Sequence, residues 1–240
     1  MSYCFISDLH LNEDRPDITK AFLNFLENTA CKAEKLYILG DLFEAWIGDD
    51  DQNEFISEVQ NALIKISKTT KVFFIHGNRD FLVGPEFASS AGMKILNDPV
   101  VEEMYGNPVL LMHGDLLCIK DIDYQKFRKV SRDIKWQTEF LNKSLGERRK
   151  IAQDLRSASK EATGEKKEEI MDVSESEVIK MIRESSVNLL IHGHTHRPNS
   201  HNIDLENHTA KRMVLGDWDE YGWYIWMDSN SCELNKFSIS

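Results

Sequence analysis

The sequence has few cysteines and no long hydrophobic run. Its four cysteines are spread over 240 residues without a Cys-x-x-Cys pair, and three lie in or beside apolar runs, so we expect buried free thiols and a reducing compartment. No stretch approaches the roughly 20 apolar residues of a membrane-spanning helix. The first apolar run is short and leads directly into Asp8, which argues against a signal peptide. We therefore expect a cytoplasmic protein that at most lies on a membrane surface.

Positively charged residues are fewer than negatively charged ones, and they are unevenly distributed along the chain. The chain has 29 Lys or Arg and 40 Asp or Glu, a net charge of −11, which taken alone argues against a polyanionic ligand. Residues 120–167 nevertheless contain 14 Lys or Arg and 8 Asp or Glu. Such a segment is either a patch for phosphate or an anionic membrane, or a solvated helical surface, and composition favours neither. We expect no nucleic-acid partner and no obligate protein partner.

Five short apolar runs are each followed by Asp, His or Asn. Runs of this length bounded by glycine are typical of buried strands, and side chains at the carboxyl ends of neighbouring strands converge on one site. Seven of the residues that follow these runs are suitable metal ligands: Asp8, His10, Asp41, Asn78, His113, His194 and His196. Seven ligands are too many for one tetrahedral ion. They fit two ions that share a carboxylate, for which Asp41 is the candidate, an arrangement that hydrolyses phosphate esters and anhydrides.

Each of these residues taken alone has a simpler explanation. An Asp after a strand is more often a helix cap, and a single His is more often a satisfied polar group, so the prediction depends on all seven occurring together. Three neighbouring acidic residues are expected to orient the ligands: Glu44, Asp80 and Asp115. His76 and His192 lie out of phase with the ligands and are expected to pack or to support them.

The order of the predicted elements indicates an α/β fold. The first 118 residues alternate strands with helical patterns at 17–27 and 54–66, which predicts a sheet with helices outside it. Gly106-Asn107 predicts a hairpin turn between strands at 100–104 and 109–112. After His196, strand patterns at 212–216, 222–227 and 232–239 suggest a second, antiparallel-rich sheet.

Residues 121–184 show helical periodicity only. Apolar stripes run along this segment, with Trp136, Phe140 and Leu145 among them. Because the segment separates one ligand-bearing strand from the next, we expect it to pack over or beside the site. We therefore predict a core domain of residues 1–120 and 185–240 with an inserted helical cap at 121–184.

The ligand motifs resemble a known family. Asp8-x-His10, Gly40-Asp41, Gly77-Asn78, His113 and Gly193-His194-x-His196 match, in order, the signature of the calcineurin-like metallophosphoesterases. This resemblance implies a β-sandwich flanked by helices. It implies one ion held by Asp8, His10, Asp41 and His196, and another held by Asp41, Asn78, His113 and His194. It also implies that a hydroxide bridging the pair attacks phosphorus in line. Mn, Zn and Fe all suit the ligands, and Mn²⁺ is the first choice.

One departure from the family pattern indicates a particular branch of the family. Arg79 stands where most members have His, and a guanidinium suits charge stabilisation better than proton donation. The run 40–50, the block 77–80 and Ser159-Lys160-Glu161-Ala162 in a basic cap are similar to the branch that hydrolyses UDP-2,3-diacylglucosamine. That branch works on the cytoplasmic face of the anionic inner membrane, in lipid A synthesis, and releases lipid X and UMP.

This closer resemblance implies particular roles. The catalytic residues would be Asp41, Asn78 and Arg79. The substrate contacts would be Asn78, Arg79, Asp121, Tyr124, Arg156, Ser159, Thr163, Lys166 and His194. Thr163 departs from the Asn that this branch favours.

Two other functions compete with this interpretation. The first is a phosphatase or phosphodiesterase for a soluble nucleotide, against which Arg79 and the apolar, basic cap argue. The second is a non-catalytic scaffold with the same fold, but such relatives typically lose ligands, and this chain keeps all seven positions.

Overall fold

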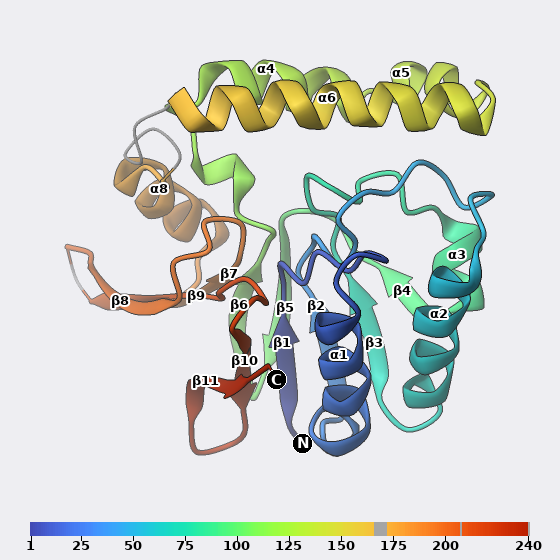
Figure 1. Cartoon of the computed structure of the whole chain (residues 1–240). Helices are drawn as coiled ribbons and strands as arrows, with labels where there is room; N and C mark the ends of the chain where they lie inside the picture. Colours follow the sequence, from blue (N-terminus) through green and yellow to red (C-terminus); the bar gives the residue numbers. More distant parts are fainter. Residues whose placement is uncertain (166–171, 207, 240) are drawn as a thin grey trace.

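The computed structural model describes residues 1–165, 172–206 and 208–239, with the side chains of 158–165 left out. Two β-sheets pack face to face, helices cover their outer faces, and a helical layer crosses one end (Figure 1). The strands are β1 Tyr3–Ile6, β2 Lys35–Ile38, β3 Lys71–Phe74, β4 Met93–Ile95, β5 Val100–Met104, β6 Asn107–Leu111, β7 Leu189–His192, β8 Asn199–Asp204, β9 Thr209–Val214, β10 Tyr221–Met227 and β11 Cys232–Ser238. The α-helices are α1 Pro16–Asn28, α2 Glu54–Ser67, α3 Pro85–Ser90, α4 Ile122–Ser131, α5 Ile134–Leu141, α6 Leu145–Glu165 and α8 Glu175–Ser185.

The first sheet has the strand order β11-β10-β1-β2-β3-β4. Strands β1 to β4 are parallel, as the predicted alternation of strands and helices requires, because each helix carries the chain back to the same end of the sheet. Helices α1, α2 and α3 cover the outer face through Phe22, Leu63 and Phe87, which are buried against the strands. The predicted strands and helices of this half are confirmed.

The second sheet has the order β5-β6-β7-β9-β8. Its β5–β6 hairpin confirms the predicted pairing, but the turn lies one residue earlier than expected, because Met104 pairs with Asn107. The turn residues are Tyr105 and Gly106, with φ of 53° and 74°. Two successive positive φ angles are what a two-residue hairpin needs to match the twist of its strands.

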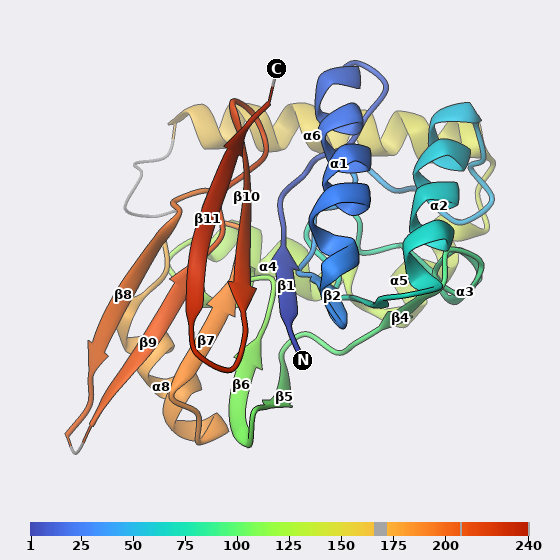
Figure 2. The ribbon, with the colours of Figure 1, turned by 90° about the horizontal axis from the view of Figure 1, so that it is seen from below.

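The C-terminal strands do not form a sheet of their own, so that expectation was wrong. Strand β9 pairs in parallel with β7 and antiparallel with β8, a strand that the sequence did not predict. The β10–β11 hairpin instead extends the first sheet beside β1 (Figure 2). The alternation in these segments correctly indicated strands, but periodicity identifies a strand without identifying its neighbour.

Most of helix α8 was expected in the cap, yet it packs on the core. Its Val178 and Ile182 are buried against Leu110 and Leu190 of the second sheet. The layer across the strand ends therefore consists of α4, α5 and α6, and α8 lies apart from it (Figure 1).

Between the two sheets lies a second apolar core that contains Phe5, Tyr37, Leu111 and Ile191. Packing on both sheets fixes the strands, and thereby the loops at their carboxyl ends. All four cysteines lie in the described part of the chain and none of them forms a disulfide; Cys4 and Cys118 are buried, Cys232 is partly buried and Cys31 is exposed. Within the described residues, we find no helix with the length and hydropathy needed to cross a membrane.

Candidate metal centre

The loops after β1, β2, β3, β6 and β7 bring all seven predicted ligands together at the carboxyl ends of the strands. The backbone is strained there. Positive φ angles, between 51° and 68°, occur at five of the seven ligands: Asp8, His10, Asp41, His194 and His196. The left-handed conformation costs a non-glycine residue on the order of 1–3 kcal/mol, and such strain is concentrated at functional sites. Here the left-handed conformation produces sharp turns after the strands, and these turns direct the side chains of the candidate ligands toward one another.

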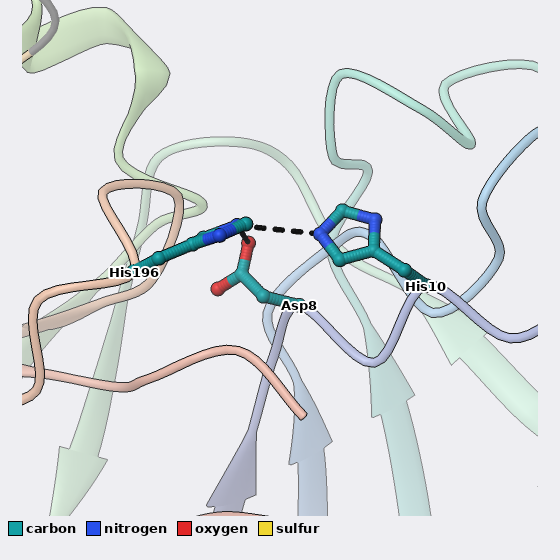
Figure 3. A group of neighbouring side chains, drawn as sticks. All are labelled: Asp8, His10 and His196. Carbon is teal, nitrogen blue, oxygen red and sulfur yellow. Dashed lines mark hydrogen bonds and ion pairs between the residues drawn. The ribbon is translucent and has the colours of Figure 1, made fainter. Parts of the chain in front are cut away.

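One cluster consists of Asp8, His10 and His196 (Figure 3). Nε2 of His196 lies 3.3 Å from Nε2 of His10 and 3.4 Å from Oδ1 of Asp8. The opposite ring nitrogens face carboxylates, since Nδ1 of His10 lies 3.0 Å from Glu44 and Nδ1 of His196 lies 3.5 Å from Asp217. These outer carboxylates orient each ring so that Nε2 points inward.

A second cluster consists of Asn78, His113 and His194. Oδ1 of Asn78 lies 2.9 Å from Nε2 of His113 and 2.8 Å from Nδ1 of His194, and the two nitrogens are 3.2 Å apart. Nδ1 of His113 lies 2.9 Å from the carbonyl oxygen of Leu39, which turns Nε2 toward the cluster.

Asp41 lies between the two clusters. Its Oδ2 is 3.9 Å from Nε2 of His10 and 3.8 Å from Nε2 of His113. Its Oδ1 accepts a hydrogen bond of 2.8 Å from the backbone N–H of Arg79. A single oxygen, Oδ2, therefore faces both clusters. Asp8 is more central than the sequence indicated, since its carboxylate also groups with Asp41 and His113.

The geometry of these residues fits two divalent ions. An ion bound to two imidazoles at about 2.0–2.1 Å in tetrahedral geometry holds the nitrogens ~3.4 Å apart. The nitrogen pairs His10–His196 and His113–His194 are 3.3 and 3.2 Å apart. Imidazole, carboxylate and carboxamide donors together suit Mn, Zn or Fe. The arrangement matches two ions with Asp41 between them.

The charges in the site shift the pKa values of its imidazoles in opposite directions. Burial lowers the pKa of His113, but the carboxylates of Asp41 and Asp8 outweigh it and raise the pKa to about 9. Burial likewise opposes protonation of His196, whose pKa is raised to about 10 by Asp217 and Asp8. Burial and the neighbouring His113 lower the pKa of His194 to about 4. His113 and His196 must therefore lose protons before they can bind a cation.

Two of the three predicted supporting carboxylates contact a candidate ligand or its backbone, whereas the third, Asp115, is bonded to the cap. Glu44 orients His10, as described above. Asp80 accepts N–H groups from Gly77 at 2.9 Å and Asp41 at 3.2 Å, and so joins two ligand loops. Asp115 was expected to orient a ligand directly, but its carboxylate accepts from Arg128 at 2.8 Å and from Tyr124, both in α4. No local pattern indicates that side chains of a cap helix would donate to this carboxylate.

Asp217 was missed by the sequence analysis. A signal for it was present, because Leu215-Gly216-Asp217 after β9 repeats the pattern Leu39-Gly40-Asp41 after β2.

A cavity of about 600 Å³ adjoins the metal centre. At one end it is lined by five predicted ligands: His10, Asp41, Asn78, His194 and His196. Its apolar lining comes from the body and the cap and includes Trp46, Phe81, Phe127, Trp136, Phe140 and Leu155. The rings of Trp136 and Phe140 stack with centroids 5.3 Å apart. A polar, ligand-rich end and an aromatic wall thus share one space.

Four of the residues predicted to contact substrate in the cap or beside it line this cavity: Arg79, Asp121, Tyr124 and Arg156. Arg156 also pairs with Glu44, the carboxylate that orients His10. Ser159 and Thr163 lie in α6, but their side chains fall outside the described part of the structure, and Lys166 lies outside the described residues altogether. Phe127, which belongs to one of the apolar stripes predicted for the cap, lies in the cavity wall, whereas Phe81 was not predicted there.

Known proteins share this sequence pattern and fold. The family model for calcineurin-like phosphoesterases matches residues 1–198. The chain is 48% identical over 231 residues to a UDP-2,3-diacylglucosamine hydrolase of Marinobacter nauticus, covering 96% of this chain and 95% of that protein. It is 47% identical over 240 residues to the protein of that name from Pseudomonas aeruginosa, with 100% of both covered. A solved archaeal phosphodiesterase has a similar fold, with a TM-score of 0.50 at 14% identity over 99% of each chain.

Proposed function

Because the chain belongs to the calcineurin-like phosphoesterase family, we propose that it hydrolyses the diphosphate bond of UDP-2,3-diacylglucosamine to UMP and 2,3-diacylglucosamine 1-phosphate. One observation carries this proposal. The cavity joins five metal ligands at one end to an aromatic and aliphatic wall at the other. A nucleotide diphosphate that carries two acyl chains needs both ends, whereas a soluble nucleotide has no use for the apolar one.

The ligands proposed for the two ions are Asp8, His10, Asp41 and His196 for one, and Asp41, Asn78, His113 and His194 for the other. We propose Mn²⁺ for both. When bound, such a pair supplies positive charge to the diphosphate and lowers the pKa of a water for in-line attack. The chain's own contribution is to fix these ligands, and the backbone strain at five of them is part of that contribution.

Arg79 stabilises the charge that develops on the phosphoryl oxygens. Its backbone is held on both sides, because its N–H donates to Asp41 at 2.8 Å and its carbonyl accepts from Trp46 at 3.1 Å. Its side chain lines the cavity beside Asn78. A guanidinium remains protonated throughout the working pH range and presents paired donors to phosphate oxygens. The Asn78 carboxamide turns its oxygen to the two imidazoles, which leaves its NH₂ group for a phosphate oxygen.

The cap provides the remaining substrate contacts. Asp121, Tyr124 and Arg156 line the cavity together with the candidate metal ligands and the apolar side chains, and we assign them to the sugar and its phosphate. Ser159, Thr163 and Lys166 stay predictions for the same groups. The acyl chains lie against Phe127, Trp136 and Phe140, where each buried methylene contributes about 0.8 kcal/mol.

The outer surface of the cap suits the cytoplasmic face of an anionic inner membrane. Ile122, Val130 and Ile134 are 63%, 52% and 80% exposed on α4 and α5. Exposed lysines lie among them, Lys129 and Lys135 included. Apolar side chains beside basic ones favour peripheral, salt-sensitive binding to anionic lipid, from which the acyl chains of the substrate enter the cavity.

Product analysis tests this function. Purified protein is incubated with UDP-2,3-diacylglucosamine in detergent, with Mn²⁺ or with a chelator, and the products are identified by mass spectrometry. We expect UMP and the diacylated sugar phosphate in the presence of Mn²⁺ and neither with the chelator. An intact lipid substrate, together with efficient hydrolysis of soluble nucleotides, would reject the proposal in favour of a soluble-nucleotide phosphoesterase.

A further inference from the structure

Helix α4 lines the cavity, and one of its faces also contacts the loops of the metal centre. Tyr124, Arg128 and Arg132 are four residues apart, so they lie on the same side of the helix, with Arg132 at its C-cap. Helix α4 belongs to the layer that crosses the end of the molecule (Figure 1). Together the three residues contact the segments that carry the predicted ligands Asn78, His113 and His194.

Arg128 holds the segments around His113. Its Nε donates to Asp115 and its terminal nitrogen donates to Asp98, both across 2.8 Å. The other oxygen of Asp98 accepts the backbone N–H of His113 at 3.1 Å. Asp98 and Asp115 are both buried, so the guanidinium keeps two like charges together on either side of this ligand.

Arg132 holds the loop that carries Asn78. Its terminal nitrogen donates to the carbonyl oxygen of Gly77 at 2.7 Å, and its guanidinium lies 5.0 Å from the centre of the Phe81 ring. The loop is tightly packed, because a Cβ at Gly77 would lie 2.1 Å from Oδ1 of Asp41. A shift of Gly77 would therefore move Asn78 with it.

Tyr124 completes the face. Its ring lies against that of His194 with centroids 5.8 Å apart, and its hydroxyl donates to Asp115. The three ligands reached from α4 are Asn78, His113 and His194. These are the residues of the second cluster, whereas His10 and His196 of the first cluster are oriented by Glu44 and Asp217 of the body.

We propose that Arg128 and Arg132 are positioning residues for one of the two ions, so that α4 is a structural part of the half-site built from Asn78, His113 and His194. The inference rests on the proposed function in that it takes the site to hold two ions. Its consequence is selective. Loss of the α4 contacts weakens the binding of one ion and leaves the binding of the other unchanged. Helix α4, which lines the substrate cavity, therefore also sets the geometry of that half-site.

The test compares Arg128→Met and Arg132→Met with Arg149→Met, a matched control on the cap. Arg149 also joins the cap to the body, through an ion pair with Asp51 at 2.5 Å, and its side chain is 60% exposed. It therefore resembles the α4 arginines in linking cap and body, but its ion-pair partner is not one of the candidate ligands. Mn²⁺ is titrated into metal-free protein by calorimetry, and bound Mn²⁺ is counted by electron paramagnetic resonance. For both α4 variants we expect one ion to bind about 10–100-fold more weakly, as outer-shell substitutions typically cause, while the other ion and both ions of the control keep wild-type affinity.

Further measurements separate positioning from general damage. At limiting Mn²⁺ the kcat of the α4 variants should fall and then recover as Mn²⁺ is raised, with KM for the lipid substrate unchanged. Arg128→Lys should recover only part of the affinity, because an ammonium lacks the fork that spans two carboxylates. If Arg128→Met does not fold, Arg132→Met decides the matter, since it removes a contact to a neutral carbonyl. Wild-type affinity for both ions in that variant, or equal weakening of both, would overturn the proposal. A wild-type protein that binds fewer than two ions, or leaves the lipid substrate intact, would instead reject the proposed function.

Discussion

The backbone N–H of Arg79 donates a 2.8 Å hydrogen bond to Oδ1 of Asp41. This bond occupies one oxygen of the carboxylate and leaves Oδ2 facing His10 and His113 at 3.9 and 3.8 Å. It also fixes the start of the Arg79 side chain beside the carboxylate that both ions would share. The group proposed to stabilise phosphoryl charge and the group proposed to bridge the ions are thus held by one contact.

Replacement of Asp41 by Ala should abolish hydrolysis and remove the carboxylate that lies between the clusters. Because Oδ2 faces both clusters, we expect both ions to be affected, in contrast to the α4 variants. Elemental analysis of the purified variant and of active wild-type protein checks this. Active wild-type enzyme with at most one ion per chain would contradict the shared-carboxylate geometry.

Replacement of Arg79 by Ala should lower kcat by about 10²–10³, as loss of one preorganised electrostatic donor does. A Lys at this position should recover part of the rate, since it restores charge without the paired donors. Steady-state kinetics at saturating Mn²⁺ measures both variants. A near-normal kcat for Arg79→Ala would assign charge stabilisation to another group.

Replacement of Asp217 by Asn should weaken metal binding about 10–100-fold, because the side chain at 217 faces Nδ1 of His196 at 3.5 Å and orients its ring. Asp219→Asn is a suitable control, since Asp219 pairs with Arg15 on the surface. Calorimetric titration with Mn²⁺ compares the two. Equal affinities in both variants would show that Asp217 does not support the ligand.

Metal binding should release protons from His113 and His196. Their pKa values in the metal-free protein are raised to about 9 and about 10, above the ordinary value for an unfolded chain, so both are protonated near neutral pH. A raised pKa stabilises the metal-free fold fully below about pH 6.5, and this stabilisation is lost as pH rises through 9 and 10. His194, with its pKa lowered to about 4, releases none at neutral pH. Calorimetry at pH 7.5 in buffers of different ionisation enthalpy measures the release, and a binding enthalpy that is the same in every buffer would refute it.

Local sequence patterns predicted which residues converge at the strand ends, but they did not predict the longer-range packing. The candidate ligands directly follow strands whose apolar character is visible in a few residues, so Asp8 and Asp41 could be recognised as candidates without knowing the fold. The hydrogen-bond partners of Asp115 depend on how α4 packs against the core, which no local sequence pattern predicts. An amphipathic helix such as α8 has the same periodicity whether it covers a sheet or a cavity, and only the burial of Val178 against Leu110 decides between them.

The C-terminal strands illustrate the same limit. Ile225 and Met227 alternate with outward-facing residues in either sheet, so the sequence predicted strands there but not that β10 pairs with β1. Asp217, by contrast, could have been found, because it follows a strand and a glycine as Asp41 does.

The most direct measurement of the central claim compares kcat/KM for UDP-2,3-diacylglucosamine with kcat/KM for UDP-glucosamine, in the same detergent and at saturating Mn²⁺. Because the apolar wall around Trp136 and Phe140 adjoins the metal centre, we expect a strong preference for the acylated substrate, and a chelator should abolish hydrolysis of both. Equal efficiency toward the two substrates would show that the cavity plays no part in recognising lipid, and would reject the proposed function.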